Sequence, residues 1–328
     1  MTGSYRAAIC TALTGPDAVR IEERAVLPLQ DGEVRIATRA AGVNFPDLLM
    51  TCGKYQFRPD PPFVPGLEIA GEVIEIGGGV TGIQHGDHVM AGAKGGGFAE
   101  QMTVPAAATM PLPGALGFEE GACWRGGATT AWHAFHDKAA LLPGETVLVL
   151  GASGGVGMAA VMLAKHLGAL VIGTASSEAR RAAILVAGAD HALDPAAPDL
   201  ADQVKALTTG KGADVVFDPV GGALSIKATR AIGWGGRFLI VGFASGETPS
   251  FPANHALIKG YSLMGLRAGE ANRRDPALAR RTRAALTELA GQGVMRPHIS
   301  HRFALDQAGQ ALRALQDRAI IGRAIISM

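Results

Sequence analysis

Residues 151–157 read Gly-Ala-Ser-Gly-Gly-Val-Gly and directly follow an apolar run, residues 146–150. The run predicts a buried strand, and the apolar spacing after the glycines predicts a helix packed on a sheet. Glycines at such a turn let the backbone bend tightly and let its N–H groups approach a pyrophosphate at the positive end of the helix. The stretch therefore predicts a dinucleotide-binding turn, with contacts from Gly151, Ser153, Gly154, Gly155, Val156 and Gly157.

The rest of the chain changes character around this turn. From about residue 141, short apolar runs alternate with helical patterns, which predicts a doubly wound parallel sheet. Before about residue 109, strand candidates separated by Gly, Pro and Asp predict an irregular β-rich domain. After about residue 267 the patterns are mixed, with helices expected at 276–289 and 305–315 and strands at 299–303 and 324–326. The fold class is therefore α/β, with a β-rich part joined to a Rossmann sheet.

The end of the next predicted strand selects the dinucleotide. NAD-binding proteins usually carry an acid there for the ribose hydroxyls, but this chain has Ser176 and Ser177, with Arg180 one helical turn later. These donors suit a ribose phosphate and favour NADPH. Two alternatives stay open: Glu178 is either a ribose ligand or an ordinary acid in the first turn of a helix, and Arg180 is either a phosphate ligand or a solvated helix charge.

Composition excludes several other classes. The 328 residues include 30 Lys and Arg against 29 Asp and Glu, so no excess charge is available to bind nucleic acid over an extended surface. The most apolar stretch, residues 155–174, is interrupted by Lys165, His166 and Gly168, which argues against a membrane span. Three widely spaced cysteines indicate reduced thiols and a cytoplasmic protein.

Motifs along the whole chain resemble those of the medium-chain dehydrogenase/reductase superfamily, in its zinc-independent quinone oxidoreductase (zeta-crystallin-like) branch. The matching segments are Ala-Gly-Val-Asn-Phe-Pro-Asp at 41–47, Pro-Gly-Leu-Glu-Ile-Ala-Gly-Glu-Val at 65–73, Gly-Asp-His-Val at 86–89, the glycine turn, Asp-Pro-Val-Gly-Gly at 218–222 and Val-Gly-Phe-Ala-Ser-Gly at 241–246. The resemblance implies a GroES-like catalytic domain (residues 1–122 and 267–328) with a Rossmann domain (residues 123–266) inserted. It also implies a cofactor in the cleft between them and a homodimer formed through the edge of the Rossmann sheet.

Zinc-dependent relatives in this superfamily carry a Cys where this chain has Asn44 and a His where it has Leu67. Neither side chain present here replaces a thiolate or imidazole as a zinc ligand. The loop at residues 91–102 contains no cysteine, so the structural zinc of those relatives is not expected either. The sequence therefore predicts no metal.

The resemblance also implies roles for single residues. Asn44 approaches the nicotinamide or the substrate, and Tyr55 lines the substrate cleft, where it either donates a proton or merely packs. Cofactor contacts are implied for Thr130, Arg180, Gly221, Gly242, Phe243, Ser245 and Arg323. Arg125 and Arg267 depart from the family pattern; they are candidate contacts to an anionic substrate, or else they face solvent or pair with acids.

Together these features predict an NADPH-dependent oxidoreductase that transfers a hydride to a quinone or an α,β-unsaturated carbonyl compound. The protein's part is to place the acceptor against the nicotinamide, with Asn44 or backbone amides stabilising the charge that develops on its oxygen. One alternative is a reductase of 2-enoyl thioesters or acrylates. An alternative of another class is an NADPH-binding redox sensor or crystallin-like structural protein without turnover.

Overall fold

The computed structural model describes residues 3–328, which form two compact units. The first unit contains the chain up to Arg125 together with residues 296–328, and the second contains residues 126–295. The boundaries expected from the sequence fall after residues 122 and 266, whereas the two units divide after residues 125 and 295. Residues 267–295 therefore belong to the second unit.

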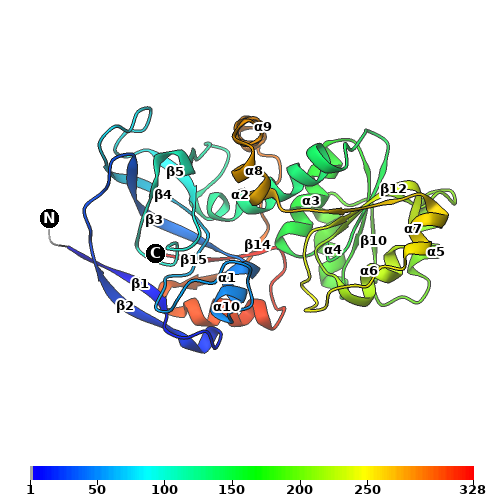
Figure 1. The fold of residues 1–328 in the computed structure, drawn as a ribbon, viewed down its shortest axis with the longest axis horizontal. Helices are drawn as coiled ribbons and strands as arrows, with labels where there is room; N and C mark the ends of the chain where they lie inside the picture. Colours follow the sequence, from blue (N-terminus) through cyan, green and yellow to red (C-terminus); the bar gives the residue numbers. More distant parts are fainter. Residues whose placement is uncertain (1–2) are drawn as a thin grey trace. The chain divides into compact units, whose positions relative to one another are not determined.

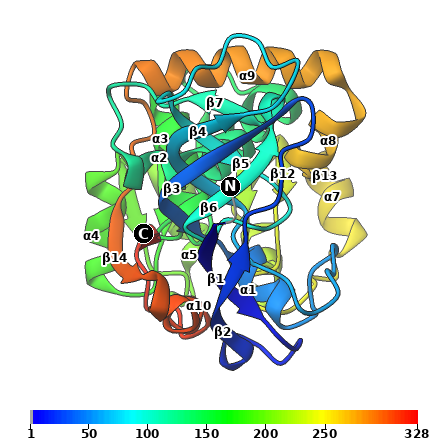
Figure 2. The same ribbon diagram turned by 90° about the vertical axis from the view of Figure 1, so that its left-hand side faces the viewer.

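The first unit is built on antiparallel strands. Strand β1 (Ser4–Cys10) pairs with β2 (Val19–Ala25), and seven further strands form one sheet in the order β14-β15-β3-β4-β5-β7, with β6 also paired to β3. These strands are β3 (Glu33–Val43), β4 (Glu68–Ile76), β5 (His88–Gly92), β6 (Gln101–Pro105), β7 (Thr109–Pro111), β14 (Ile299–Ala304) and β15 (Arg323–Ser327). Only β14 and β15 run parallel. Figure 2 shows this sheet from the side of the first unit.

The C-terminal segment of the chain joins that sheet beside β3. The C-terminal strand β15 pairs antiparallel with β3, with Ala324 opposite Val43. Helix α1 (Phe45–Thr51) follows β3 directly, and α10 (Ala308–Gln316) lies beside α1 in both ribbon views. The buried side chains of α10 close a core made with Val34, Ile36 and Ile69 of the sheet. This pairing places Arg323 next to the segment that carries Asn44.

Helix α2 (Phe118–Trp132) continues into a six-residue π-helix, His133–Lys138. Short 3-10 turns lie at Pro16–Ala18, Ala106–Ala108 and Leu305–Gln307. No helix in the described part of the chain is long and apolar enough to cross a membrane.

The second unit is a six-stranded parallel sheet in the order β10-β9-β8-β11-β12-β13. Its strands are β8 (Thr146–Val149), β9 (Leu170–Thr174), β10 (His191–Leu193), β11 (Ala213–Asp218), β12 (Ile232–Ile240) and β13 (Ser262–Gly265). Numbered in chain order, the strands have the 3-2-1-4-5-6 arrangement of a Rossmann fold. The order in which the chain adds strands reverses between β8 and β11, while all strands stay parallel. The predicted doubly wound sheet is confirmed.

Helices cover both faces of this sheet. Figure 1 shows α3 (Gly155–His166) and α4 (Glu178–Val186) on one side, and α5 (Leu200–Leu207), α6 (Gly222–Ala228) and α7 (Ala253–Lys259) on the other. Two more helices follow β13, α8 (Ala268–Arg274) and α9 (Pro276–Gly291). The central strands β8, β9 and β11 are largely buried, as expected where helices cover both faces.

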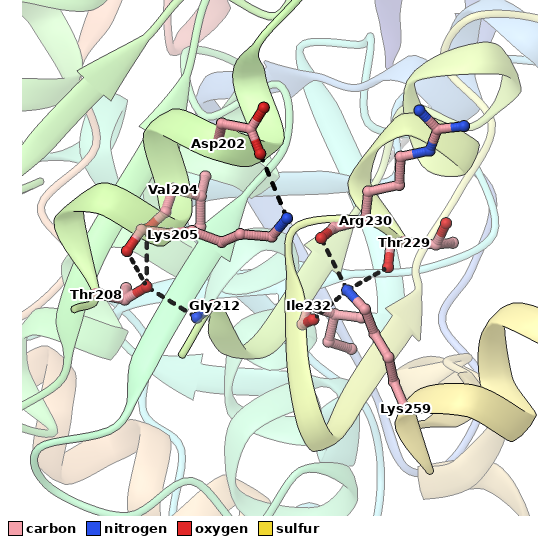
Figure 3. Close-up of polar contacts among 9 residues, drawn as sticks. All are labelled: Asp202, Val204, Lys205, Thr208, Gly212, Thr229, Arg230, Ile232 and Lys259. Atoms are coloured by element: carbon pink, nitrogen blue, oxygen red, sulfur yellow. Dashed lines mark hydrogen bonds and ion pairs between the residues drawn. The ribbon is translucent and has the colours of Figure 1, made fainter. Parts of the chain in front are cut away.

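Lys259, the last residue of α7, holds this helix against the sheet near the edge strand β13. Lys259 Nζ donates hydrogen bonds to the backbone carbonyls of Thr229 (3.2 Å), Arg230 (2.8 Å) and Ile232 (2.7 Å), at the turn between α6 and β12 (Figure 3). Burial lowers the pKa of Lys259, and the charge of Lys205 lowers it further. The ammonium group thus holds α7 in place while the outer face of the helix stays exposed.

Candidate functional site

The glycine turn lies where β8 gives way to α3, at the carboxyl edge of the sheet. Gly151 has φ +57°, and a Cβ there would lie 2.7 Å from Val220 Cγ2. A Cβ on Gly157 would lie 2.5 Å from the carbonyl oxygen of Gly151, so only glycine lets α3 pack this closely against the turn. Gly154 is the N-cap of α3, which leaves the first N–H groups of the helix, from Gly155 onward, without acceptors inside the helix.

This geometry fits the pyrophosphate of a dinucleotide. Unpaired N–H groups and the positive end of the helix dipole face the same place, and the missing side chains leave room for close backbone approach. The turn therefore has the features expected of a pyrophosphate-binding turn formed by Gly151, Gly154, Gly155, Val156 and Gly157.

Hydroxyls and guanidinium groups gather at the neighbouring turn between β9 and α4. Arg180 Nη1 donates to Ser153 Oγ at 3.3 Å, which joins this turn to the glycine turn. Ser177 caps α4, and its Oγ accepts the N–H of Arg180 at 3.4 Å. Ser176 and Glu178 are exposed. The arginine is thus turned back over the glycine turn.

A second arginine that the sequence analysis overlooked lies beside it. Arg181 Nη1 donates to the carbonyl oxygen of Ala175 at 3.1 Å and pairs with Asp194 at 3.7 Å. Its position directly after Arg180 was a signal available in the sequence. The Arg181 guanidinium group is thus held by Ala175 and Asp194, and Arg180 is the arginine of this corner whose charge suits a phosphate.

Backbone hydrogen bonds join the loops that follow β11 and β12. The N–H of Ser245 donates to the carbonyl oxygen of Val220 at 2.8 Å, and the N–H of Gly222 donates to that of Glu247 at 3.0 Å. A Cβ on Gly221, at φ +77°, would lie 2.7 Å from the Glu247 carbonyl oxygen. The loops that contain Gly221, Gly242, Phe243 and Ser245 therefore form one layer at the carboxyl edge of the sheet, where α/β proteins bind ligands.

Asp218 holds the first of these loops. Its Oδ1 accepts the N–H groups of Val220 (2.8 Å) and Gly221 (3.0 Å), and Ser225 Oγ donates to its Oδ2. Burial raises the pKa of Asp218, while these three hydrogen bonds oppose the rise. An acid directly after the apolar run of residues 215–217 was the sequence signal for this role.

Thr130 lies on α2 in the second unit and is half-buried. Its Oγ1 donates to the carbonyl oxygen of Gly126 one turn earlier, at 2.8 Å. The hydroxyl proton is therefore committed to the helix, and its oxygen lone pairs remain the atoms with which Thr130 would meet a ligand.

In the first unit, Asn44 lies between β3 and α1 as the N-cap residue of α1, although its side chain makes no capping hydrogen bond. Its Nδ2 donates to Glu68 Oε1 at 3.0 Å and to the carbonyl oxygen of Gly42 at 3.3 Å. Glu68 forms an ion pair with Arg323, and both of these side chains are buried. The structure thus brings Asn44 and Arg323 together through Glu68, an acid for which the sequence analysis assigned no role.

A second buried acid supports the same segment. Asp47 Oδ2 accepts the N–H of Asn44 at 2.9 Å, and its Oδ1 accepts the N–H of Gly66 at 3.0 Å. Burial raises the pKa of Asp47 to about 7, against the opposing effect of these hydrogen bonds and of Arg323. Asp47 therefore ties the start of α1 to the loop that leads into β4.

Three further candidates lie on other segments of the chain. Tyr55 is half-buried in the loop after α1. Arg125 Nη1 donates to the carbonyl oxygen of Ala108 at 2.6 Å. Arg267 is exposed at the start of α8 in the second unit. Arg125 belongs to the first unit and Arg267 to the second.

Within residues 3–328, no group of three or more His, Cys, Asp or Glu side chains is placed to hold a metal ion. Cys123 is buried, and burial raises the pKa of its thiol to about 12, so it stays protonated at neutral pH.

The class of protein follows from this fold and from comparison with known families. Residues 30–114 match the family model described as alcohol dehydrogenase GroES-like domain, and residues 155–283 match the model described as zinc-binding dehydrogenase. The chain belongs to the quinone oxidoreductase-like branch of the medium-chain dehydrogenase/reductase superfamily. It is an oxidoreductase with a GroES-like domain and a Rossmann domain that binds a nicotinamide nucleotide.

Individual relatives match over nearly the full length. The quinone oxidoreductase-like protein 2 homolog of Nematostella vectensis is 38% identical over 327 residues, covering 99% of this chain and 89% of that protein. A probable oxidoreductase from Mycobacterium abscessus is 35% identical and superposes with a TM-score of 0.90, over 99% of both chains. A mycobacterial protein solved in complex with NADPH is 28% identical, with a TM-score of 0.89 over 98% of this chain and 100% of that one.

Proposed function

We propose that this protein uses NADPH to reduce a quinone or an α,β-unsaturated carbonyl compound. The observation that carries the cofactor assignment is the hydrogen bond from Arg180 to Ser153, which places a guanidinium group over the glycine turn. The acceptor class is supported by the relatives, one of which is described as a quinone oxidoreductase-like protein.

NADPH is favoured over NADH by the charge at the turn between β9 and α4. Ser176 and Ser177 stand where an acid would bind the ribose hydroxyls of NAD, and Arg180 follows in the first turn of α4. An arginine presents several N–H donors in a fixed plane that matches a phosphate group. A mycobacterial relative was solved in complex with NADPH, which agrees with this assignment.

The bound cofactor supplies a hydride to the acceptor, and the protein supplies position and protons. The loops at Gly221 and Gly242 to Ser245 would cover the nicotinamide end, and Asn44 would meet the nicotinamide or the acceptor. Tyr55 carries a phenol able to donate a proton to the carbon of a reduced enone. A hydroquinone product takes its protons on oxygen, where water serves equally well.

The chemistry needs no metal in this proposal. Asn44 and Leu67 occupy the positions of two zinc ligands in zinc-dependent relatives, and neither offers a thiolate or an imidazole. The Asn44 amide is also already bound to Glu68 and Gly42. The matched family model is described as a zinc-binding dehydrogenase, so metal content is a decisive property to measure.

The partner in solution would be a second copy of this chain, joined through the edge strand β13. Strand β13 is the last in its sheet, and large apolar side chains near it are exposed: Trp234 (81%), Leu257 (81%), Ile258 (66%) and Leu263 (40%). An unpaired strand edge with apolar neighbours favours pairing with another chain, and a two-fold axis lets the same surface serve both copies. Lys259 keeps α7, and with it Leu257 and Ile258, in a fixed position.

A panel of acceptors tests the proposal. Quinones, enones, acrylates and enoyl thioesters are each added to the purified protein with NADPH or NADH, and cofactor oxidation is followed. Preference for quinones or simple enones with NADPH supports the proposal, whereas oxidation with enoyl thioesters alone assigns a different acceptor. Binding of NADPH without turnover on any acceptor would indicate a sensor or structural protein. A cytoplasmic location and the absence of nucleic-acid binding remain predictions from the sequence.

A further inference from the structure

Three polar side chains of the first unit form a chain of contacts that ends at a candidate ligand-binding residue. Arg323 pairs with Glu68, and Glu68 Oε1 accepts a hydrogen bond from Asn44 Nδ2 at 3.0 Å. Arg323 and Glu68 retain 6% and 5% of their exposed surface, whereas Asn44 is half-buried. The buried ion pair therefore supports a side chain that still reaches the surface of its unit.

The partners determine which way the Asn44 amide faces. Amide nitrogen and oxygen are distinguished by the groups they meet, and both groups on this side of Asn44 only accept hydrogen bonds. One is the Glu68 carboxylate, held by the Arg323 cation, and the other is the carbonyl oxygen of Gly42. The –NH₂ group must therefore face them, and both of its N–H bonds are used.

The backbone around Glu68 allows this close approach. Gly42 lies on β3 opposite Glu68 in the pairing of β3 with β4. A Cβ on Gly42 would lie 3.1 Å from Glu68 Cγ and 2.3 Å from the carbonyl oxygen of Ala122. A larger residue at position 42 would push the Glu68 side chain away from Asn44. Sheet register, glycine and ion pair thus combine to fix one amide orientation.

We propose that Glu68, held by Arg323, is a positioning residue that makes Asn44 a hydrogen-bond acceptor only. Asn44 then offers its Oδ1 to a ligand N–H or O–H and has no N–H left to stabilise an oxyanion. This inference rests on the proposed function, in which Asn44 meets the cofactor or the acceptor. Two sources of the donor share this chemistry: the carboxamide –NH₂ of the nicotinamide and a hydroxyl group of the acceptor.

A double-mutant cycle tests the positioning role through the affinities for NADPH and for a hydroxyquinone, an acceptor whose hydroxyl group can donate to Asn44 Oδ1. Asn44→Ala is expected to weaken the affected ligand about five- to tenfold, the usual value of one hydrogen bond. Glu68→Gln should cause a similar loss because a glutamine can donate to Asn44 and let its amide turn over. In the Asn44→Ala background, Glu68→Gln should then have no further effect. If the two losses multiply instead, Glu68 acts independently of Asn44 and the proposal is wrong.

Two further variants keep the test sound. Glu68→Gln leaves Arg323 buried without its partner, so the double variant Glu68→Gln/Arg323→Gln, which removes both charges, is measured in parallel. Glu72→Gln is the matched control, since Glu72 lies on the same strand and pairs with Arg39 at 3.0 Å on the surface. The control should bind both ligands as the wild type does, and its failure to do so would show that any lost carboxylate on β4 has the same effect.

An NADPH analogue that carries an acetyl group in place of the carboxamide identifies the source of the donor. It keeps the carbonyl oxygen and lacks the N–H bonds. The donor belongs to the cofactor if the wild type binds NADPH more tightly than the analogue while Asn44→Ala binds the two equally. An unchanged preference combined with a raised dissociation constant for a hydroxyquinone in Asn44→Ala assigns it to the hydroxyl group of the acceptor. Binding titrations need no turnover, so they remain informative even if none of the acceptors is reduced.

Discussion

Arg180 of helix α4 donates a hydrogen bond from its Nη1 to Oγ of Ser153, at 3.3 Å, across the gap between two successive strand-to-helix turns. Ser153 lies within the glycine turn after β8, and Arg180 lies in the first turn of α4, the helix that follows β9. The contact brings a cation and two backbone turns to one point at the carboxyl edge of the sheet, which is where the proposal places the ribose phosphate of NADPH.

Replacing Arg180 tests the cofactor preference. A hydrogen bond to a charged group contributes about 1.5–3 kcal/mol, so Arg180→Ala should weaken NADPH binding about ten- to a hundredfold and spare NADH. Fluorescence titration with each cofactor measures both values. Arg181→Ala is the control because its guanidinium is already bound to the Ala175 carbonyl and Asp194. Equal losses of NADPH and NADH in Arg180→Ala would place the phosphate elsewhere.

Tyr55 is tested by removing its hydroxyl group alone. If the phenol protonates the carbon of an enone, Tyr55→Phe should lower enone turnover about a hundredfold and affect quinone reduction much less. The two kcat values are compared on the same preparation. Tyr5→Phe, which removes a phenol hydroxyl from β1 in the same unit, should change neither. A small, uniform effect on both acceptors would make Tyr55 a packing residue.

The proposed dimer surface predicts a change in assembly. Leu257→Glu/Ile258→Glu places two charges on the exposed face of α7, and burying them against a second copy would be unfavourable. Sedimentation should then show a monomer where the wild type is a dimer. Leu27→Glu, at an equally exposed leucine (71%) in the other unit, should remain dimeric. A dimer that survives the double substitution would require another interface.

Asp47 predicts a pH dependence of stability. Its carboxyl has a pKa of about 7 in the folded protein against 3.8 ordinarily, because it is buried. Between these values the folded state holds more protons than the unfolded state, so this group makes stability fall as pH rises from about 4 to about 7. Asp47→Asn cannot ionise, and its melting temperature should fall less than that of the wild type between about pH 5 and about pH 8.

The control for that experiment is Asp87→Asn. Asp87 accepts the N–H of Gln84 in an exposed turn, so it resembles Asp47 in bonding but not in burial. Its melting curve should follow the pH dependence of the wild type. Identical slopes for all three proteins would mean that Asp47 is ionised throughout this range.

Much of the second unit was predictable from local sequence. The apolar runs at residues 146–150 and 215–217 match β8 and β11, because a strand buried on both faces needs a continuous apolar run. Strands β10 and β13 were not predicted. Each has only three or four residues at a sheet edge, where exposure removes the apolar signal.

The first unit shows what local sequence does not reveal. Glu68 lies in an apolar segment, and an acid in such a place signals a buried partner, but nothing near it identifies that partner. Arg323 lies 255 residues further along the chain and reaches Glu68 only because β15 pairs with β3. Contacts of this kind depend on sheet topology, so the sequence indicated Arg323 as a candidate but not its contact with Glu68.

The initial rate of NADPH oxidation with a simple quinone, compared with that of NADH, tests the proposed reaction itself. The protein is first dialysed against a strong chelator, and its zinc content is measured alongside the rates. Zinc-free protein should turn over, with kcat/KM for NADPH about tenfold or more above that for NADH. Preference for NADH, or activity that disappears with the metal and returns with added zinc, would contradict it.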